Sequence, residues 1–150
     1  MDKSTIMINE LLVNLFNDVL QIEEQSLRDG VLSDISITEI HTIEAIGIYS
    51  ERTMSEVAQK LKITVSTLTT AINKLIKKGY VERKRIEEDR RVVLVKLTKR
   101  GKLADRLHQK FHGEMINNAI EGLSLKEEEI LISSLNKLND FFKEKYKLEQ

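Results

Sequence analysis

The 150-residue sequence has no cysteine, no proline and no tryptophan, and it has only three Tyr and four Phe. Without cysteine the chain forms no disulfide and cannot sense oxidants through a thiol. With so few aromatic side chains, its core must be mainly aliphatic. It also lacks a secretory signal and a long apolar run, so we expect a cytoplasmic protein with no membrane partner.

The formal net charge is zero, but the charges are unevenly distributed along the chain. Residues 53–102 carry 14 Lys and Arg against 5 Asp and Glu, whereas the rest of the chain carries 10 against 19. A basic segment of this size is typical of proteins that bind a polyanion such as nucleic acid, although an ordinary solvated surface accounts for part of it.

A helix-turn-helix is predicted in the basic segment, where two helix starts follow each other. Thr53 and Glu56 have the spacing of a capping box, which starts a helix. Thr64 is a second N-cap, and its helix is expected to run to Lys78 and to end at Gly79. The polar face of this helix carries short hydroxyl and amide side chains, which let a helix lie deep in a major groove.

We therefore assign the polar face of the second helix to the DNA major groove. Asn73 has the geometry for paired hydrogen bonds to adenine, and threonine methyl groups pack on thymine. Some members of the set are expected to contact only phosphates. The predicted major-groove residues are Ser66, Thr67, Thr69, Thr70, Asn73 and Lys74.

Two runs rich in β-branched residues, 81–86 and 92–97, follow the second helix and predict a β-hairpin with a charged tip at 87–91. A short strand is also expected near Arg52 and Thr53. No nucleophilic triad, Gly-rich phosphate loop or carboxylate pair stands out, so we do not expect an enzyme. A winged-helix module that binds proteins instead of DNA is the alternative, and the hydroxyl-rich helix and basic hairpin argue against it.

The motif Lys78-Gly79-Tyr80-Val81, followed by Asp89-x-Arg91, five residues and Leu97-Thr98-x-x-Gly101, resembles the winged helix-turn-helix of the MarR family. The resemblance extends over nearly the whole chain. It implies a transcription repressor that binds a palindromic operator in double-stranded DNA as a homodimer.

The resemblance also implies roles for the hairpin, which would be the wing. Arg91 would enter or border the minor groove while Asp89 holds its guanidinium. An ion pair that merely closes the hairpin is the alternative. The other basic residues of the wing, Arg83, Lys84, Arg85 and Arg90, are expected to neutralise phosphates.

Long amphipathic helices are predicted at both ends of the chain, over residues 5–28 and 124–147, with further helices at 36–49 and 98–121. One small core cannot cover this apolar surface, so we expect a dimer interface, with packing inside the chain as the alternative. MarR proteins dimerise through such terminal helices.

The predicted fold is therefore mainly α with a small β-hairpin wing, as one MarR-like domain over residues 1–150. We place its winged helix-turn-helix core at 36–101 and the helical dimerisation region at 1–30 and 102–150.

The three histidines could converge on a zinc ion. His108 and His112 are four residues apart on one predicted helix, His41 lies in another, and Glu24 or its neighbour Glu23 ends a third. The set Glu24, His41, His108 and His112 resembles the primary site of zinc-responsive MarR repressors. A Cys and acidic residues that accompany a second metal site in those proteins are missing. We expect no metal, with packed histidines or an effector-cavity lining as the other roles.

Residues 35–43, 78–83 and 88–93 are most similar to the MarR-type repressors of fatty-acid synthesis genes in Gram-positive cocci. That resemblance implies a long-chain acyl group, delivered on acyl carrier protein, as co-repressor. The acidic carrier would dock on Lys102, Arg106 and Lys110, which recur every four residues, with Arg28 as a possible fourth member.

We expect the effector cavity where the first, second and fifth helices meet, and for each lining residue an ordinary core position is the alternative. The predicted lining is Phe16, Val19, Leu20, Ile40, Ile43, Leu107, Phe111 and Met115.

Overall fold

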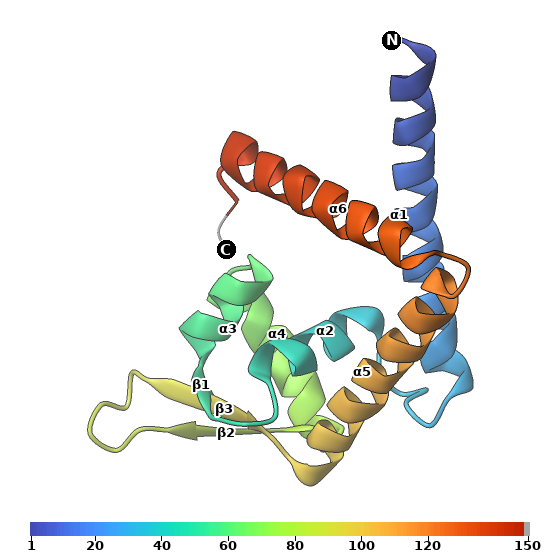
Figure 1. Ribbon diagram of the computed structural model, residues 1–150. Coiled ribbons are helices and arrows are strands. Elements are labelled where there is room, and N and C mark those ends of the chain that lie inside the picture. The colour runs from blue at the N-terminus through green and yellow to red at the C-terminus, as the bar shows by residue number, and fades with distance from the viewer. Residues whose placement is uncertain (149–150) are drawn as a thin grey trace. The chain divides into compact units, whose positions relative to one another are not determined.

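The computed structural model describes residues 1–148 (Figure 1). The predicted order of helices and strands is confirmed, including the short strand before the third helix. The last two residues of the predicted region 102–150 lie outside the described residues. The elements are α1 (Lys3–Asp29), α2 (Ile37–Ile46), β1 (Arg52–Thr53), α3 (Met54–Leu61), α4 (Val65–Lys77), β2 (Val81–Arg85), β3 (Val93–Leu97), α5 (Lys99–Ile120) and α6 (Leu125–Tyr146).

The chain forms two compact units, residues 1–111 and residues 112–150, and the boundary falls inside α5. The first half of α5 belongs to the first unit, where Ala104, Asp105 and His108 are buried.

Short polar side chains start the helices as predicted. At Ser124, the reciprocal bond from its own N–H to Glu127 Oε2, 2.7 Å long, completes a capping box. At the start of α2 the corresponding Glu39 instead binds Lys78 Nζ at 2.8 Å. The side chains that accept a hydrogen bond from the N–H three residues on at a helix start are Asp2, Ser36, Thr53, Thr64, Thr98 and Ser124.

Helix α2 ends at Ile46, three residues before the predicted end. Gly47 follows it with a φ of 78°, which is costly for residues with a Cβ and stops the helix. Gly79 follows α4 and also has a positive φ, 83°, so it ends that helix as predicted.

The core of the first unit is aliphatic apart from Tyr80, as the composition predicted. Its inner residues come from α2, α3, α4, the sheet, the turn at Tyr80 and the start of α5. The largest apolar side chains with essentially no exposure are Tyr80, Ile40, Ile43, Ile46, Leu68, Ile72, Leu75, Val57 and Val95.

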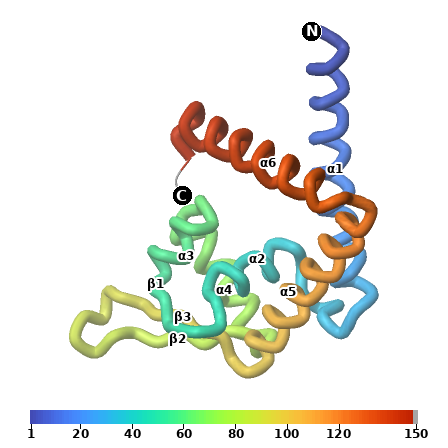
Figure 2. The backbone as a smooth tube through the Cα atoms, in the orientation of Figure 1, coloured from blue at the N-terminus to red at the C-terminus, as the bar shows by residue number. Residues whose placement is uncertain are grey.

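The strands form an antiparallel sheet in the order β1-β3-β2. Arg83 of β2 pairs with Val95 of β3, and Thr53 of β1 pairs with Leu94. Figure 2 shows the loop that joins β2 to β3 extending beyond the paired strands. This hairpin is the wing, and β1 connects its base to the start of α3.

Helices α1 and α6 expose much of their apolar surface. In α1 the buried residues are Glu23 and Leu27, near its C-terminal end, whereas Leu15 and Phe16 are 60% and 66% exposed. In the second unit, α6 has no buried residue, and Phe141 and Phe142 are among its exposed side chains. Among the described residues, none of the helices has the length and apolar character needed to cross a bilayer.

Candidate nucleic-acid interface

Helix α4 presents a polar face because its other face is fixed in the core. Leu68, Ile72 and Leu75 of α4 are completely buried, which leaves the intervening positions toward solvent. Thr69 is half-buried. The other predicted major-groove residues, Ser66, Thr67, Thr70, Asn73 and Lys74, are exposed.

The hydroxyl groups at the start of α4 are held in place by local hydrogen bonds. Thr64 Oγ1 accepts from the Thr67 N–H at 3.1 Å and donates to Thr67 Oγ1 at 2.9 Å. Thr67 therefore keeps its own O–H for an outside acceptor such as a phosphate or a base edge. Thr69 instead donates its hydroxyl to the Val65 carbonyl at 2.8 Å.

A groove of about 700 Å³ runs between α4, the wing and the start of α3. It contains half of the predicted DNA-binding residues, and it combines hydroxyl, amide and guanidinium donors, the groups that bind phosphates and base edges. Its lining residues are Thr53, Met54, Ser55, Val65, Thr69, Asn73, Arg83, Lys84, Arg85, Arg91, Val92 and Val93.

Asn73 and Arg83 connect the recognition helix to the wing. Arg83 Nη1 donates to Asn73 Oδ1 at 2.8 Å, although the two residues lie on different elements. Sequence reasoning assigned them separately, Asn73 to bases and Arg83 to phosphates. The spacing of two exposed residues on a helix and a strand gave no indication of this contact.

Asp89 holds Arg91 as the family resemblance implied. Arg91 Nε and Nη2 donate to the two carboxylate oxygens at 2.9 and 3.0 Å, and the Arg91 backbone N–H adds a third bond at 3.1 Å. These bonds lower the pKa of Asp89 and raise the pKa of Arg91. The Arg91 side chain is still 91% exposed, so the pair presents a fixed cation to solvent.

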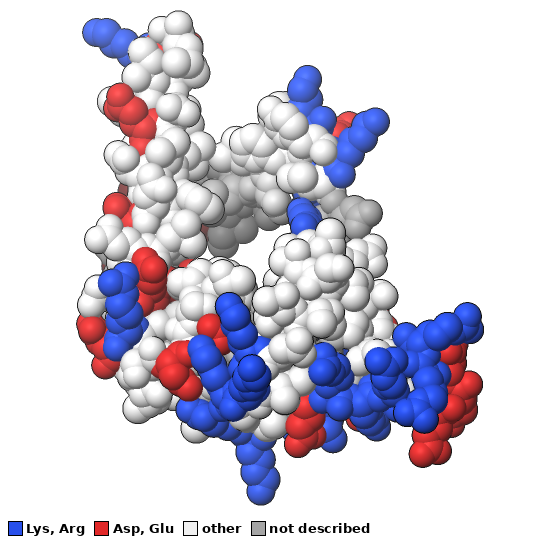
Figure 3. Space-filling view, turned by 180° about the vertical axis from the view of Figure 1, so that it is seen from behind, with Lys and Arg blue, Asp and Glu red and all other residues white. Residues whose placement is uncertain are grey.

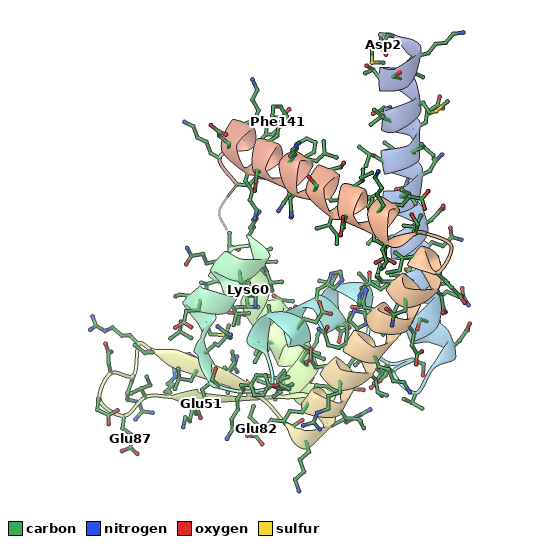
Figure 4. All side chains as sticks on the ribbon, viewed as in Figure 1. Asp2, Glu51, Lys60, Glu82, Glu87 and Phe141 are labelled. Atoms are coloured by element: carbon green, nitrogen blue, oxygen red, sulfur yellow. The ribbon has the colours of Figure 1, made fainter. Side chains whose placement is uncertain are left out.

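The remaining wing cations differ in what holds them. Arg85 Nη1 donates to the Arg90 carbonyl at 2.8 Å, while Lys84 forms an ion pair with Glu51 at 2.9 Å. Lys and Arg gather over the wing, with acidic groups at its end (Figure 3). Figure 4 places Glu87 at this tip and Glu51 nearer the base of the hairpin. The wing thus combines a basic body with an acidic tip.

A polar network that the sequence did not reveal fixes the end of α4 against α5. Tyr80 donates its hydroxyl to Asp34 Oδ1 at 2.7 Å, and Arg100 binds Asp34 Oδ2 at 3.0 Å while its guanidinium lies 4.3 Å from the centre of the Tyr80 ring. Burial and the neighbouring Asp34 raise the pKa of Tyr80 to about 12. Lys78 Nζ also contacts the Asp34 carbonyl.

Two histidines meet a buried glutamate where α1, α2 and α5 pack together. Glu23 Oε1 lies 3.2 Å from His41 Nε2 and 2.9 Å from His108 Nε2, and Glu44 Oε1 lies 3.1 Å from the same His108 atom. Burial alone would lower the pKa of His108, but Glu44 and Glu23 outweigh it and raise that pKa. Burial, followed by the charge of Glu44, raises the pKa of Asp105 on the same helix.

The predicted zinc ligands are only partly brought together. Glu23, His41 and His108 offer ligand atoms within 4.8 Å of one another. The predicted carboxylate, Glu24, is exposed and pairs with Arg28 at 3.2 Å, because one residue along a helix turns the side chain to another face. His112 belongs to the second unit.

The predicted effector residues lie in different surroundings. Leu107 and Phe111 line a groove of about 160 Å³ with Ser26, Leu27, Gly30, Val31, Leu32 and His108. Ile40 and Ile43 instead belong to the buried core, since an apolar helical period is the same for core and for cavity lining. Val19 and Leu20 are half-buried, Phe16 is exposed, and Met115 belongs to the second unit.

The predicted carrier-docking residues lie on α5 and at the end of α1. Arg106 and Lys110 are exposed, Lys102 is half-buried, and Arg28 is paired with Glu24. Lys102, Arg106 and Lys110 are four residues apart and therefore lie on one side of α5. Arg106 and Lys110 are next in sequence to Leu107 and Phe111, which line the groove of about 160 Å³.

Comparison with known proteins identifies this architecture. The MarR family profile matches residues 33–92, the segment that holds the helix-turn-helix and most of the wing. The chain belongs to the MarR family of helix-turn-helix transcription regulators. The structure of Streptococcus pneumoniae FabT in complex with DNA is similar, with a TM-score of 0.88 and 45% sequence identity, over 93% of this chain and 98% of that one.

Two regulators of Bacillus subtilis are similar in sequence. The uncharacterised HTH-type regulator YfiV is 30% identical over 107 residues, which cover 71% of this chain and 66% of YfiV. The uncharacterised HTH-type regulator YhjH is 25% identical over 92 residues, which cover 61% of this chain and 53% of YhjH. The chain thus spans about half to two thirds of the length of these relatives.

Proposed function

We propose that this chain is a repressor that binds a palindromic operator in double-stranded DNA as a homodimer. The groove between α4 and the wing carries the proposal, because it gathers hydroxyl, amide and guanidinium donors on a rigid winged core. The likeness to FabT, whose structure contains DNA, supports the same function. Salt-dependent binding to duplex DNA is the first test, and its absence would favour a protein-interaction module instead.

The homodimer is supported by the apolar surfaces of the terminal helices. In the first unit, α1 exposes Leu11, Leu15 and Phe16, and in the second unit α6 exposes Leu135 and Phe141. Exposed apolar patches of this extent mark a surface that another chain covers. A two-fold dimer would also match the symmetry of a palindromic site.

We propose further that the repressed genes encode fatty-acid synthesis enzymes and that a long-chain acyl group on acyl carrier protein is the co-repressor. This proposal rests on the 45% identity with FabT and on the resemblance to repressors of such genes. The groove lined by Leu107 and Phe111 offers apolar surface for part of an acyl chain. Arg106 and Lys110 provide positive charge for an acidic carrier.

The co-repressor is tested by titrating labelled operator with and without acyl carrier protein that bears a long acyl chain. The co-repressor must bind the DNA-competent state better, so it should raise operator affinity by roughly 1 to 3 kcal/mol. Combined Arg106→Glu and Lys110→Glu changes should remove this gain and leave unassisted binding nearly intact. Lys126→Glu, at the start of α6, is the matched control and should retain it.

A second variant tests the path of the acyl chain itself. Val19→Trp enlarges a half-buried side chain on α1 and should also abolish the gain from the acylated carrier. If the acylated carrier leaves the affinity of the unmodified protein unchanged, or lowers it, the co-repressor proposal is wrong.

Zinc regulation is the second candidate, and the cluster of Glu23, His41 and His108 is the observation that favours it. A structural zinc site usually takes four ligands. Glu23, His41 and His108 supply three and Glu44 lies 3.1 Å from His108 Nε2, but the resemblance to repressors of fatty-acid synthesis includes these histidines without implying a metal. We therefore expect added zinc or a chelator to change operator affinity little. A large, reversible change in operator affinity at about micromolar zinc, abolished by His108→Ala, would favour zinc regulation over the acyl co-repressor.

A further inference from the structure

The hydrogen bond between Asn73 and Arg83 sets both residues apart from their neighbours in the groove. Arg91 has its guanidinium on Asp89, and Arg85 binds the backbone of the wing, so both are fastened within the hairpin. Arg83 is the arginine of the wing whose guanidinium is bound to α4, through the 2.8 Å contact with Asn73. It therefore lies against the element that enters the major groove.

The contact limits what Asn73 can do on DNA. Reading adenine with two hydrogen bonds requires the amide oxygen to accept from the base amino group while the amide nitrogen donates. Here the oxygen already accepts from a cation, and a base amino group would have to approach the same oxygen beside the guanidinium. Adenine reading by Asn73 would therefore require its amide oxygen to accept two hydrogen bonds side by side, one from the base and one from Arg83.

The same contact leaves Arg83 suited to a base. A guanidinium has five N–H donors in a fixed plane, and the bond to Asn73 uses one of them. The edge formed by Nε and Nη2 keeps the geometry for two parallel bonds to O6 and N7 of guanine, the commonest specific arginine contact in the major groove. A guanidinium held by a neighbour also loses less conformational freedom when it binds.

We propose that Arg83 reads a guanine in the major groove and that Asn73 is its positioning residue rather than an independent reader of adenine. This inference rests on the proposed DNA-binding function and replaces the assignment of Arg83 to phosphates. The two residues then form one recognition unit, built from α4 and β2, in each half-site of the operator.

The experiment begins by selecting a preferred duplex from a random library with the unmodified protein. Each base pair of the selected site is then exchanged in turn between G·C and A·T. The affinity for each changed site is compared with the affinity for a random duplex. Arg83→Lys keeps the charge and loses the planar fork, so it should reduce discrimination at one guanine per half-site by roughly 5- to 150-fold, the range of a bidentate contact. Binding to the random duplex should change less than about threefold.

Asn73→Ala identifies the positioning role, because it should weaken discrimination at the same guanine as Arg83→Lys. Combining the two changes should add little beyond either one, since they break one unit. Asn73→Asp can still accept from Arg83 and should restore guanine preference, although its charge lowers affinity for every duplex. Lys96→Arg, a charge-conserving exchange on β3 outside the groove, is the control and should leave that guanine preference intact.

The outcomes separate this inference from the proposed function. If the unmodified protein shows no sequence-preferring, salt-dependent duplex binding, both fail. If it selects a site but Arg83→Lys keeps every guanine preference, Arg83 is not a base reader. If Asn73→Ala alters an A·T position and spares the guanine, Asn73 reads adenine by itself and the recognition unit does not exist. Circular dichroism should show native helix content in all variants, since both side chains are exposed.

Discussion

The carboxylate of Asp89 holds the guanidinium of the exposed Arg91, and this arrangement predicts an electrostatic rather than a sequence-reading role on DNA. Arg91→Ala should weaken binding to the operator and to random duplexes alike. It should also reduce the slope of log affinity against log salt by roughly one, because each neutralised phosphate contributes about 0.9. Titrations at several salt concentrations measure the slope.

Lys96→Ala is a suitable control for that measurement. Lys96 lies on β3 and pairs with Glu82 at 3.5 Å, outside the groove between α4 and the wing. Its removal should leave the slope close to that of the unmodified protein. An unchanged slope for Arg91→Ala would mean that Arg91 does not contact DNA.

The carboxylates around His108 predict a pH dependence of stability. Glu44 and Glu23 raise the pKa of folded His108 above its usual value, against the opposing effect of burial. A raised histidine pKa stabilises the folded protein fully below the unfolded pKa of about 6.5, and this contribution is lost as pH rises through the folded pKa. The stability difference between the unmodified protein and His108→Gln should therefore be larger at about pH 6 than at about pH 8.5.

Urea unfolding with chelator present measures that difference at both pH values. The chelator ensures that proton binding, and not metal binding, is compared. A stability difference that grows with rising pH would show that the carboxylates do not hold a charged imidazole.

At the scale of elements, helix α5 is fixed to the winged core through a glycine. A Cβ at Gly101 would lie 2.1 Å from the Tyr80 carbonyl oxygen, so a larger residue must displace backbone. Gly101→Ala should lower the free energy of unfolding by roughly 1 to 3 kcal/mol, the usual cost of overpacking. Thermal or urea unfolding of the purified variant measures it.

The same helix supplies a matched control for this change. A Cβ at Gly113 would meet nothing within 4 Å, so only helix propensity acts there. Gly113→Ala should stabilise the protein by roughly 0.5 to 1 kcal/mol. Equal effects of the two substitutions would show that the start of α5 is not tightly packed on Tyr80.

The helix and strand order could be predicted because local chemistry determines it here. N-caps such as Thr64 and Ser124 and the left-handed Gly79 act within a few residues, so the sequence contains the necessary information. The end of α2 was placed too late because the conformation of Gly47 depends on the turn into β1.

The functional residues were predicted less completely because their contacts join distant parts of the chain. An apolar helical period could not distinguish the buried core residues Ile40 and Ile43 from cavity lining. The choice between Glu23 and Glu24 depends on the rotation of α1 against α2 and α5. The pairing of Asn73 with Arg83 depends on the packing of a helix against a strand, which residue spacing does not encode.

At the scale of the whole molecule, the exposed apolar face of α6 predicts that dimerisation is required for operator binding. Leu135 is 50% exposed in the single chain. Leu135→Glu would place an unpaired charge in the proposed interface and should raise the dimer dissociation constant at least about tenfold, equivalent to roughly 1.4 kcal/mol. Analytical ultracentrifugation measures the constant, and operator binding should weaken in parallel.

Lys137→Glu is the control for added negative charge on the same helix, because Lys137 is an exposed polar position. It should leave the dimer largely intact. If Leu135→Glu is dimeric at the same concentrations as the unmodified protein, α6 is not part of the interface.

The pairing of β1 with β3 has a mechanical consequence. Thr53 pairs with Leu94 in the sheet and is also the N-cap of α3, so the base of the wing and the helix-turn-helix share one residue. A force that bends the hairpin is transmitted to α3 rather than absorbed in a flexible joint. The loop over residues 86–92 lies beyond this pairing and has its own hydrogen bonds, such as the Ile86 N–H to the Val92 carbonyl at 3.1 Å, so a change in the angle of the wing would also reorient α3.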